Sequence, residues 1–175
     1  MKVKPITTIK TVVDTIEEGG SDIKVFALVD PDHWELPPFR PGAHIDLHLP
    51  GGLVRTYSLC NDPADNKRYL VAVKRERDGR GGSVQLHDEI KVGDTIGVTL
   101  PRGGFKLDAD MTRHVFVAGG IGVTPFLSAA AFLQRSGRPN FRLHVVARGE
   151  PPLQAMLAPL MKAGHVVVHD TARSG

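Results

Sequence analysis

An antiparallel β-barrel or sandwich followed by a parallel α/β unit is the architecture expected for this chain of 175 residues. Up to about residue 110, short segments rich in Val, Ile, Leu and Thr alternate with turn residues. Beyond that point the pattern becomes strand, helix, strand, helix, strand. Many short strands with regular turns are typical of antiparallel barrels and sandwiches, whereas alternating strands and helices predict a parallel sheet with right-handed crossovers. We therefore divide the chain into residues 1–109 and 110–175.

Turn signals such as Pro41-Gly42 and Pro50-Gly51-Gly52 separate the strands expected in the first part. These strands are Ile23–Asp30, His44–Leu49, Leu53–Leu59, Tyr69–Lys74 and Thr95–Leu100. A helix-like segment, Gly82–Ile90, interrupts them. The first ten residues are polar and lack the apolar core of a signal peptide.

The second part contains the elements of a nucleotide-binding sheet. Its expected strands are His114–Ala118, Phe141–Ala147 and His165–Asp170, and its expected helices are Thr124–Gln134 and Pro152–Ala163. Proline in the first turn of the second helix costs nothing, because the first N–H groups of a helix have no partner within it. A complete doubly wound domain has five or six strands. We therefore expect 110–175 to be its N-terminal part, in a piece of a longer protein or with its open sheet edge covered.

Composition excludes several classes of function. Hydrophobic residues make up 41% and the formal net charge is +3, which is too small and too evenly spread to predict nucleic-acid binding. The longest apolar run, Val115–Val123, is too short to span a membrane, so a cytoplasmic location is expected. Cys60 is the one cysteine, which excludes an internal disulfide or a cysteine-ligated cluster. His44 and His48 share a strand face, but without a third ligand they do not predict a metal site.

The first motif with chemical meaning is Arg55-Thr56-Tyr57-Ser58. Strand alternation places Arg55 and Tyr57 on one face, and Thr56 and Ser58 on the other. A flavin requires an apolar or aromatic wall against its ring, hydroxyl groups at its polar edge and a cation for its phosphate, and these residues provide all three. An exposed barrel face with a cross-strand Tyr and Arg would look the same, so the tetrapeptide alone leaves both interpretations open.

The second motif, Gly79-Arg80-Gly81-Gly82-Ser83, precedes the helix-like segment. Glycines let backbone N–H groups approach an anion closely, and a helix N-terminus adds a positive field. Ser83 is placed either to cap that helix or to donate to a phosphate. Taken alone, the motif favours a flexible loop ended by a serine cap over an anion site.

The third motif is Ala118–Pro125, which contains Gly119, Gly120 and Gly122 between a buried strand and a helix. In that context a glycine-rich turn binds a pyrophosphate. The spacing departs from G-x-G-x-x-G, because Pro125 occupies the place of the last glycine. A tight turn without a ligand is the alternative, and the position between strand and helix favours the ligand.

In this order, the three motifs resemble those of the ferredoxin–NADP reductase superfamily. Within it, the sequence is similar to the phthalate dioxygenase reductase branch, which includes the reductase components of vanillate demethylases. The residues that carry the resemblance are Arg55–Asp62, Ala72–Arg75, Gly79–Ser83 and Ala118–Pro125. It extends over nearly the whole chain, and the combination is far more specific than any one motif.

The resemblance implies a six-stranded antiparallel Greek-key barrel that binds flavin, followed by part of a parallel α/β nucleotide-binding domain. In this branch the flavin is FMN, and an iron–sulfur domain follows at the C-terminus. The sequence departs from the family because it contains neither the Cys-Gly-Pro segment placed beside the nicotinamide nor the cysteines of the iron–sulfur domain. We therefore expect a complete flavin site, an incomplete dinucleotide site and no iron–sulfur cluster or other metal within this chain.

The resemblance also implies roles for the motif residues. Those implied to contact FMN are Arg55, Thr56, Tyr57, Ser58, Ala72, Val73, Lys74, Arg80, Gly81, Gly82 and Ser83. Those implied to contact NAD are Gly119, Gly120, Gly122, Thr124, Pro125 and Arg148. Arg55 and the Gly81–Ser83 turn are expected at the phosphate and Tyr57 against the ring or ribityl chain, with Thr56, Ser58 and Thr124 near the reactive edge. No side chain is required to act as a general acid or base.

The implied activity is hydride transfer from NADH to the flavin, followed by single-electron transfer to an iron–sulfur domain or protein of a terminal oxygenase or demethylase. The choice of NADH over NADPH as the hydride donor rests only on the resemblance to this branch. A second function is open, that of a flavin-binding or docking module or fragment without NADH turnover of its own. A third is an FAD enzyme, which requires an adenine-stacking aromatic residue. Phe105 is the only nearby candidate for it, so FMN is expected.

Overall fold

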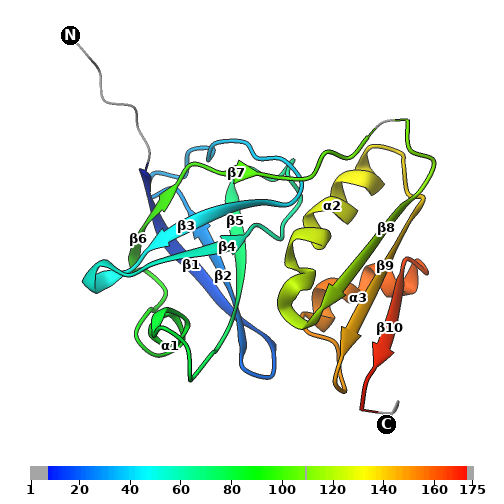
Figure 1. Cartoon of the computed structure of the whole chain (residues 1–175). Helices are drawn as coiled ribbons and strands as arrows, with labels where there is room; N and C mark the ends of the chain where they lie inside the picture. Colours follow the sequence, from blue (N-terminus) through cyan, green and yellow to red (C-terminus); the bar gives the residue numbers. More distant parts are fainter. Residues whose placement is uncertain (1–7, 109, 173–175) are drawn as a thin grey trace.

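The computed structural model of the chain describes residues 8–108 and 110–172. Within them, seven strands form an antiparallel sheet that curls into a barrel, and a parallel sheet stands beside it (Figure 1). The barrel strands are β1 (Thr8–Gly20), β2 (Ile23–Val29), β3 (Ala43–His48), β4 (Val54–Ser58), β5 (Arg68–Lys74), β6 (Thr95–Thr99) and β7 (Arg102–Gly103). The 3-10 turn η1 (Pro50–Gly52) joins β3 to β4, and helix α1 (Gly82–Asp88) lies between β5 and β6. The predicted architecture is confirmed.

The barrel has an open seam between β4 and β5. These strands are the two ends of the hydrogen-bonded order β4-β3-β6-β1-β2-β5. They approach each other at a bridge between Leu59 and Val71. Beyond this bridge no described residue of β4 is paired with β5, so the seam is accessible to a ligand. The interior is filled by large apolar side chains, including Phe26, Ile45 and Leu47.

The sequence pattern does not predict β1, the longest strand of the barrel. A register shift between Val13 and Thr15 breaks its alternation, so no single period of two runs along it. Thr11 is also buried within this strand, and its hydroxyl donates to the carbonyl of Ile96 at 2.8 Å. With β1 the barrel has the six strands of the resemblance, and the short β7 pairs with β3 outside that order.

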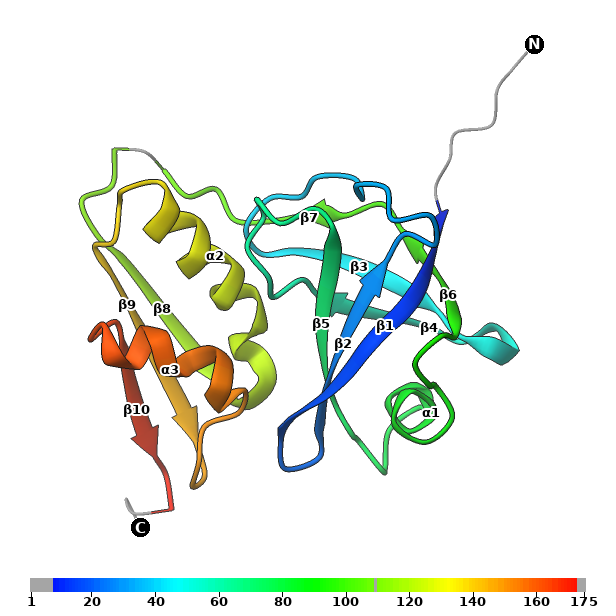
Figure 2. The ribbon, with the colours of Figure 1, turned by 180° about the vertical axis from the view of Figure 1, so that it is seen from behind.

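The second sheet is parallel throughout, with the order β10-β9-β8. Its elements are β8 (His114–Gly119), η2 (Gly120–Val123), α2 (Thr124–Arg135), β9 (Phe141–Ala147), α3 (Gln154–Lys162) and β10 (Val166–Asp170). In Figure 2, α3 crosses one face of β9 and β10. The predicted parallel sheet is confirmed. None of the helices in the described segments is long and apolar enough to cross a membrane.

Helix α3 begins later than the sequence predicts. Residue Leu153, with φ 56° and ψ 41°, has a left-handed backbone and forms the N-cap, so the helix starts at Gln154. Pro152 therefore precedes the helix instead of lying in its first turn, and Pro159 lies inside it. The cause is tertiary, because the Leu153 N–H is taken up by a carbonyl of the barrel, that of Gly19.

One apolar cluster joins the barrel to the parallel sheet. Its barrel members are Ile23, Val25, Cys60 and Ala72. Its buried members from the second part are Phe116, Ala118, Val123, Leu127, Ala129, Ala130, Leu133, Phe141, Leu143, Val145, Leu153, Leu157 and Leu160. Continuous burial of this kind holds the two parts together. The predicted division after residue 109 stays a prediction, since residue 109 lies outside the described residues.

Candidate functional site

A groove of about 450 Å³ lies at the open seam of the barrel. It is lined by Arg55, Thr56, Tyr57, Ser58, Ala72, Lys74, Glu76, Gly79, Arg80, Gly82, Ser83, Ile121, Gly122 and Thr124. The structure thus brings together most of the residues predicted to contact FMN, and the η2–α2 turn forms the opposite wall. Glu76 and Ile121 also line the groove, although neither was among the residues expected to contact a ligand. Ile121 lies inside the third motif, and Glu76 directly follows Ala72–Arg75.

Arg55 reaches from β4 to the glycine-rich loop before α1. Its Nη1 donates to the carbonyl of Val54 at 2.8 Å, and its Nη2 donates to the carbonyl of Arg80. A Cβ on Gly82 would lie only 2.6 Å from Arg55 Nε, so the guanidinium fits because residue 82 is glycine. A guanidinium carries five N–H donors, and donors remain for an anion. Gly82 therefore provides the space that the Arg55 side chain occupies, independently of any contact that Gly82 makes with a phosphate.

The glycine-rich loop ends in a left-handed glycine and not in a serine cap. Gly81, with φ 80°, is the N-cap of α1 and makes no side-chain capping bond. Ser83 lies inside the first turn, where its hydroxyl accepts a hydrogen bond from the Glu76 N–H at 3.0 Å. Of the two roles considered for Ser83, the helix cap is therefore excluded. Ser83 instead ties α1 to the segment that follows β5.

Positive charge predominates around the groove. Arg55, Arg80 and Lys74 line it together with one acidic residue, Glu76. The Lys74 ammonium and the Glu76 carboxylate are 3.2 Å apart and both are well exposed, so this pair partly neutralises itself. The remaining charge at the loop end of the groove is suited to an anionic group.

The Thr56 hydroxyl is held on the outer face of the barrel. It donates to Asp46 Oδ1 at 2.6 Å, and Arg102 Nη2 donates to both oxygens of that carboxylate at 2.7 Å. The Thr99 hydroxyl accepts from the Asp46 N–H and from Arg102 Nη1. This clasp, formed by Asp46, Arg102, Thr56 and Thr99, connects β4, β3, β6 and β7. The hydrogen bonds from Arg102 and Thr56 lower the pKa of Asp46.

Tyr57 is half-buried between the barrel core and the groove. Burial raises the pKa of its phenol, and the nearby Arg55 guanidinium opposes this shift. Tyr57 therefore offers a neutral aromatic wall. Val73 and Gly81 are not among the lining residues of the groove, and contact with FMN at these two positions stays a prediction. Strand alternation directs Val73 into the barrel core, where it is fully buried.

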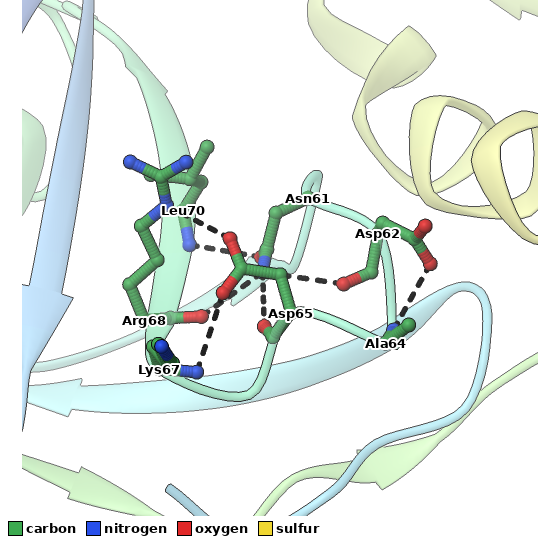
Figure 3. Close-up of polar contacts among 7 residues, drawn as sticks. All are labelled: Asn61, Asp62, Ala64, Asp65, Lys67, Arg68 and Leu70. Carbon is green, nitrogen blue, oxygen red and sulfur yellow. Dashed lines mark hydrogen bonds and ion pairs between the residues drawn. The ribbon is translucent and has the colours of Figure 1, made fainter. Parts of the chain in front are cut away.

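Asn61 fixes the connection between β4 and β5 (Figure 3). Its Nδ2 donates to the carbonyls of Asp65 and Arg68, each at 2.9 Å, and its Oδ1 accepts from the Leu70 N–H at 3.0 Å. The neighbouring Asp62 pairs with Arg135 of α2 at 3.4 Å. Asn61 thereby sets the end of β5 relative to β4. In the sequence, Asn61 is one of the residues Arg55–Asp62 that carry the resemblance, and its hydrogen-bond partners are identified only by the fold.

A second groove, of about 1030 Å³, continues from the first. Lys74, Glu76 and Ile121 line both. One side of the second groove carries Gly119, Gly120 and Arg148, as predicted for the dinucleotide, and the other side is the β1–β2 hairpin. A Cβ at any of the three motif glycines would meet no atom within 4 Å, so their backbone is open to a ligand. Pro125 lines neither groove and serves as an N-terminal residue of α2.

Phe105 is engaged in an aromatic stack. Its ring lies 5.3 Å from that of Phe126 and 6.3 Å from that of Phe116, with interplanar angles of 11° and 24°. Its N–H donates to the carbonyl of Pro41 at 2.7 Å. Phe105 lines neither groove, and so it joins the two parts of the chain instead of presenting a face to a ligand.

A family model for the oxidoreductase FAD-binding domain matches residues 10–107, which include the whole lining contributed by the barrel. The chain belongs to this family. The oxidoreductase FAD-binding domain here carries the first groove on its open seam, and the match ends before β8. The family takes its name from FAD, so a flavin is the class of cofactor that it implies.

Comparison with individual proteins also relates the chain to reductases of oxygenases and demethylases by name. The chain is 46% identical over 132 residues to phthalate dioxygenase reductase of Burkholderia cepacia, covering 75% of this chain and 41% of that protein. It is 43% identical over 140 residues to vanillate O-demethylase oxidoreductase of Pseudomonas putida, covering 80% and 44%. The chain therefore spans less than half the length of these two relatives.

A solved structure of phthalate dioxygenase reductase matches 95% of this chain and 52% of that one, with a TM-score of 0.89 at 38% identity. It is described as a modular structure for electron transfer from pyridine nucleotides to [2Fe-2S]. The resemblance to the phthalate dioxygenase reductase and vanillate demethylase reductase branch is thus confirmed, as is the ferredoxin reductase-like fold.

Proposed function

We propose that this oxidoreductase domain binds FMN in the seam groove and NADH in the adjoining groove. In this proposal it works as part of a reductase that serves an oxygenase or demethylase. The observation that carries the proposal is the continuity of the two grooves through Lys74, Glu76 and Ile121. Two ligands in these grooves would meet at this junction, and Thr124 lines the seam groove on the side of the η2–α2 turn. Electron transfer between bound molecules requires such a meeting point.

The seam groove fits an FMN-sized ligand. Its volume of about 450 Å³ lies within the range of roughly 300–1,000 Å³ usual for small-molecule sites. Arg55, Arg80 and the glycine backbone would hold the phosphate, and Tyr57 would flank the ring or ribityl chain. Because the Thr56 hydroxyl is already bound to Asp46, Ser58 is the better candidate for the polar edge.

FMN is favoured over FAD by the position of Phe105. An adenine would need an exposed aromatic face beyond the phosphate, and the candidate Phe105 is stacked with Phe116 and Phe126 instead. The preference for FMN therefore rests on the position of Phe105 in this chain and on the branch that the chain resembles, although the family model is named for FAD.

NADH is favoured over NADPH by the charge of the second groove. Its acidic lining residues outnumber its basic ones: Glu17, Glu18, Asp22, Glu76 and Glu150 stand against Arg68, Lys74 and Arg148. An extra phosphate on the adenosine ribose would be repelled by this excess, whereas ribose hydroxyls can donate to carboxylates. Glu150, which lies in the loop after β9, is the acidic residue nearest in sequence to Arg148 and was not predicted.

When bound, the flavin would supply the chemistry, accepting a hydride from NADH at N5 and giving electrons singly to an iron–sulfur acceptor. The side chains of this domain bind and orient. Tyr57 and Ile121 supply apolar surface that excludes water, the cations neutralise phosphate, and no side chain need carry a proton.

The proposal is tested with the purified chain. Apoprotein titrated with FMN and with FAD, followed by flavin fluorescence, should bind FMN at least about tenfold more tightly, a difference of about 1.4 kcal/mol. Anaerobic NADH should then bleach the bound flavin. Preferential binding of FAD would overturn the choice of cofactor. Tight FMN binding without bleaching would instead identify a flavin-binding or docking module.

A further inference from the structure

The loop between β9 and α3 is fastened at both ends. Near its start the Gly149 N–H donates to Asp170 Oδ1 at the end of β10, at 2.8 Å. At its end the Leu153 N–H donates to the carbonyl of Gly19, near the end of β1, at 2.7 Å. Figure 2 shows the β1–β2 hairpin extending toward the start of α3. Loop 148–153 thus bridges the parallel sheet and the barrel.

Leu153 occupies a notch that exists because residue 19 is glycine. A Cβ on Gly19 would lie 2.8 Å from Leu153 Cδ2 and 2.8 Å from Ile23 Cγ2, closer than real Cβ contacts. The Leu153 side chain is only 1% exposed. It therefore fills a space formed by the barrel hairpin, although it belongs to the α/β part of the chain.

The backbone of Leu153 supports the same conclusion. Its φ of 56° lies in the left-handed region, which is uncommon for a side chain of this size. Such a conformation persists where the surroundings hold it in place. Here the holding contacts are the hydrogen bond to Gly19 and the buried notch. Pro151 and Pro152 restrict the preceding backbone further.

The loop carries residues of the large groove. Arg148 and Glu150 line one wall, and Gly19 and Leu153 line the place where the two walls meet. With both ends fastened and two prolines between them, the loop can move little unless the Leu153 contact opens.

We infer that Leu153 is a positioning residue for the large groove. Seated against Gly19, it holds the barrel hairpin and loop 148–153 at one separation and so sets the width of the groove where Arg148 and Glu150 lie. Leu153 affects the groove indirectly, by positioning the loop that carries Arg148 and Glu150. The inference rests on the proposed function only in so far as this groove receives the dinucleotide.

Hydrogen–deuterium exchange of the purified chain tests the contact directly. Leu153→Ala removes the side chain, and Gly19→Ala fills the notch from the barrel side without a left-handed backbone to strain. Both should speed amide exchange about tenfold or more in 17–23 and 148–153, while β3 and β4 keep their protection. Leu133→Ala, a fully buried leucine of α2 outside both grooves, is the matched control. If the amides of 17–23 and 148–153 exchanged in both test variants at the same rate as in the unmodified protein, the inference would be overturned.

Anaerobic reduction by NADH provides the functional readout. Both test variants should raise the NADH concentration needed for half-maximal flavin reduction about tenfold or more, because misplacement of about 1 Å can cost on the order of a hundredfold. Flavin retention should stay at the parental level. Leu153→Met, which conserves volume, should restore parental behaviour within about twofold. If the parent protein is not reduced by NADH, the proposed function fails, and the exchange experiment alone decides the inference.

Discussion

Arg55 and Gly82 occupy one small volume at the loop end of the seam groove, where the guanidinium already donates to the carbonyls of Val54 and Arg80. Arg55→Ala should weaken FMN binding about tenfold to a hundredfold, since a hydrogen bond to a charged group contributes roughly 1.5–3 kcal/mol. Flavin titration of the apoprotein measures this. Arg77→Ala is the matched control, because Arg77 is an exposed arginine of the same loop and does not line the groove. Unchanged affinity in Arg55→Ala would remove Arg55 from the site.

Gly82 offers a second test of the same contact. Gly82→Ala should lower thermal stability and FMN affinity in the parent, because the new Cβ would lie 2.6 Å from Arg55 Nε. In an Arg55→Ala background the stability cost of Gly82→Ala should largely vanish, since the two positions are then no longer in conflict. Thermal unfolding of the four proteins in this double-mutant cycle measures the coupling. An equal cost in both backgrounds would mean that Gly82 is needed for another reason.

Cys60 should be chemically inert in the folded protein. It is 2% exposed, its Sγ donates to the carbonyl of Leu70 at 3.2 Å, and burial raises the pKa of its thiol to about 12. The thiolate is the reactive form of cysteine, so alkylation at neutral pH should be negligible until the protein is unfolded. Mass spectrometry after iodoacetamide treatment, with and without denaturant, checks this. Rapid modification of the native protein would show that the cluster around Cys60 opens readily.

Strands β3, β4, β6 and β7 are connected by the Asp46–Arg102 clasp on the outer face of the barrel. The pKa of Asp46 is lowered in the folded state, so its contribution to stability is fully present above the ordinary value of 3.8. That contribution is lost as the pH falls through the lower folded value. Asp46→Asn should therefore cost about 0.5–1 kcal/mol at neutral pH, because Arg102 is half-exposed.

The pH dependence separates this clasp from a simple loss of packing. The stability gap between the parent and Asp46→Asn, measured by urea unfolding, should be constant above about pH 5 and should narrow below about pH 4. Thr56→Val removes the hydroxyl donor while leaving the ion pair, and it should show a smaller gap. A gap that does not change with acid pH would exclude the carboxylate as its cause.

The barrel and the parallel sheet share a continuous apolar interface, to which Val25 and Ala72 contribute from one side and Phe116 and Leu153 from the other. We therefore expect the two parts to unfold in one cooperative transition, because each would expose apolar surface if it remained folded alone. Scanning calorimetry should give equal calorimetric and van't Hoff enthalpies. Two resolved transitions, or a ratio well above one, would show that the parts are independent.

The elements could be predicted from the sequence to the extent that their causes are local. Strand β9 was predicted with its observed bounds, and α2 to within one residue at its end. Alternation, turn glycines and an N-terminal proline act within a few residues, so they can be read along the chain. The lining residues of the seam groove likewise come from short motifs next to strand ends. By contrast, β1 was missed because its register shift between Val13 and Thr15 removes the periodic signal.

Other features depend on contacts between segments far apart in the sequence. The seating of Arg55 against Gly82, the stacking of Phe105 with Phe126 and the burial of Val73 in the barrel all require the barrel to be closed. The delayed start of α3 depends on the carbonyl of Gly19, which lies more than a hundred residues before Leu153 in the chain. Local patterns thus identify which residues form the site, because turns and periodicity are short-range. Packing between distant segments sets the widths of the two grooves. It also decides which polar groups and ring faces in them remain free to contact a ligand.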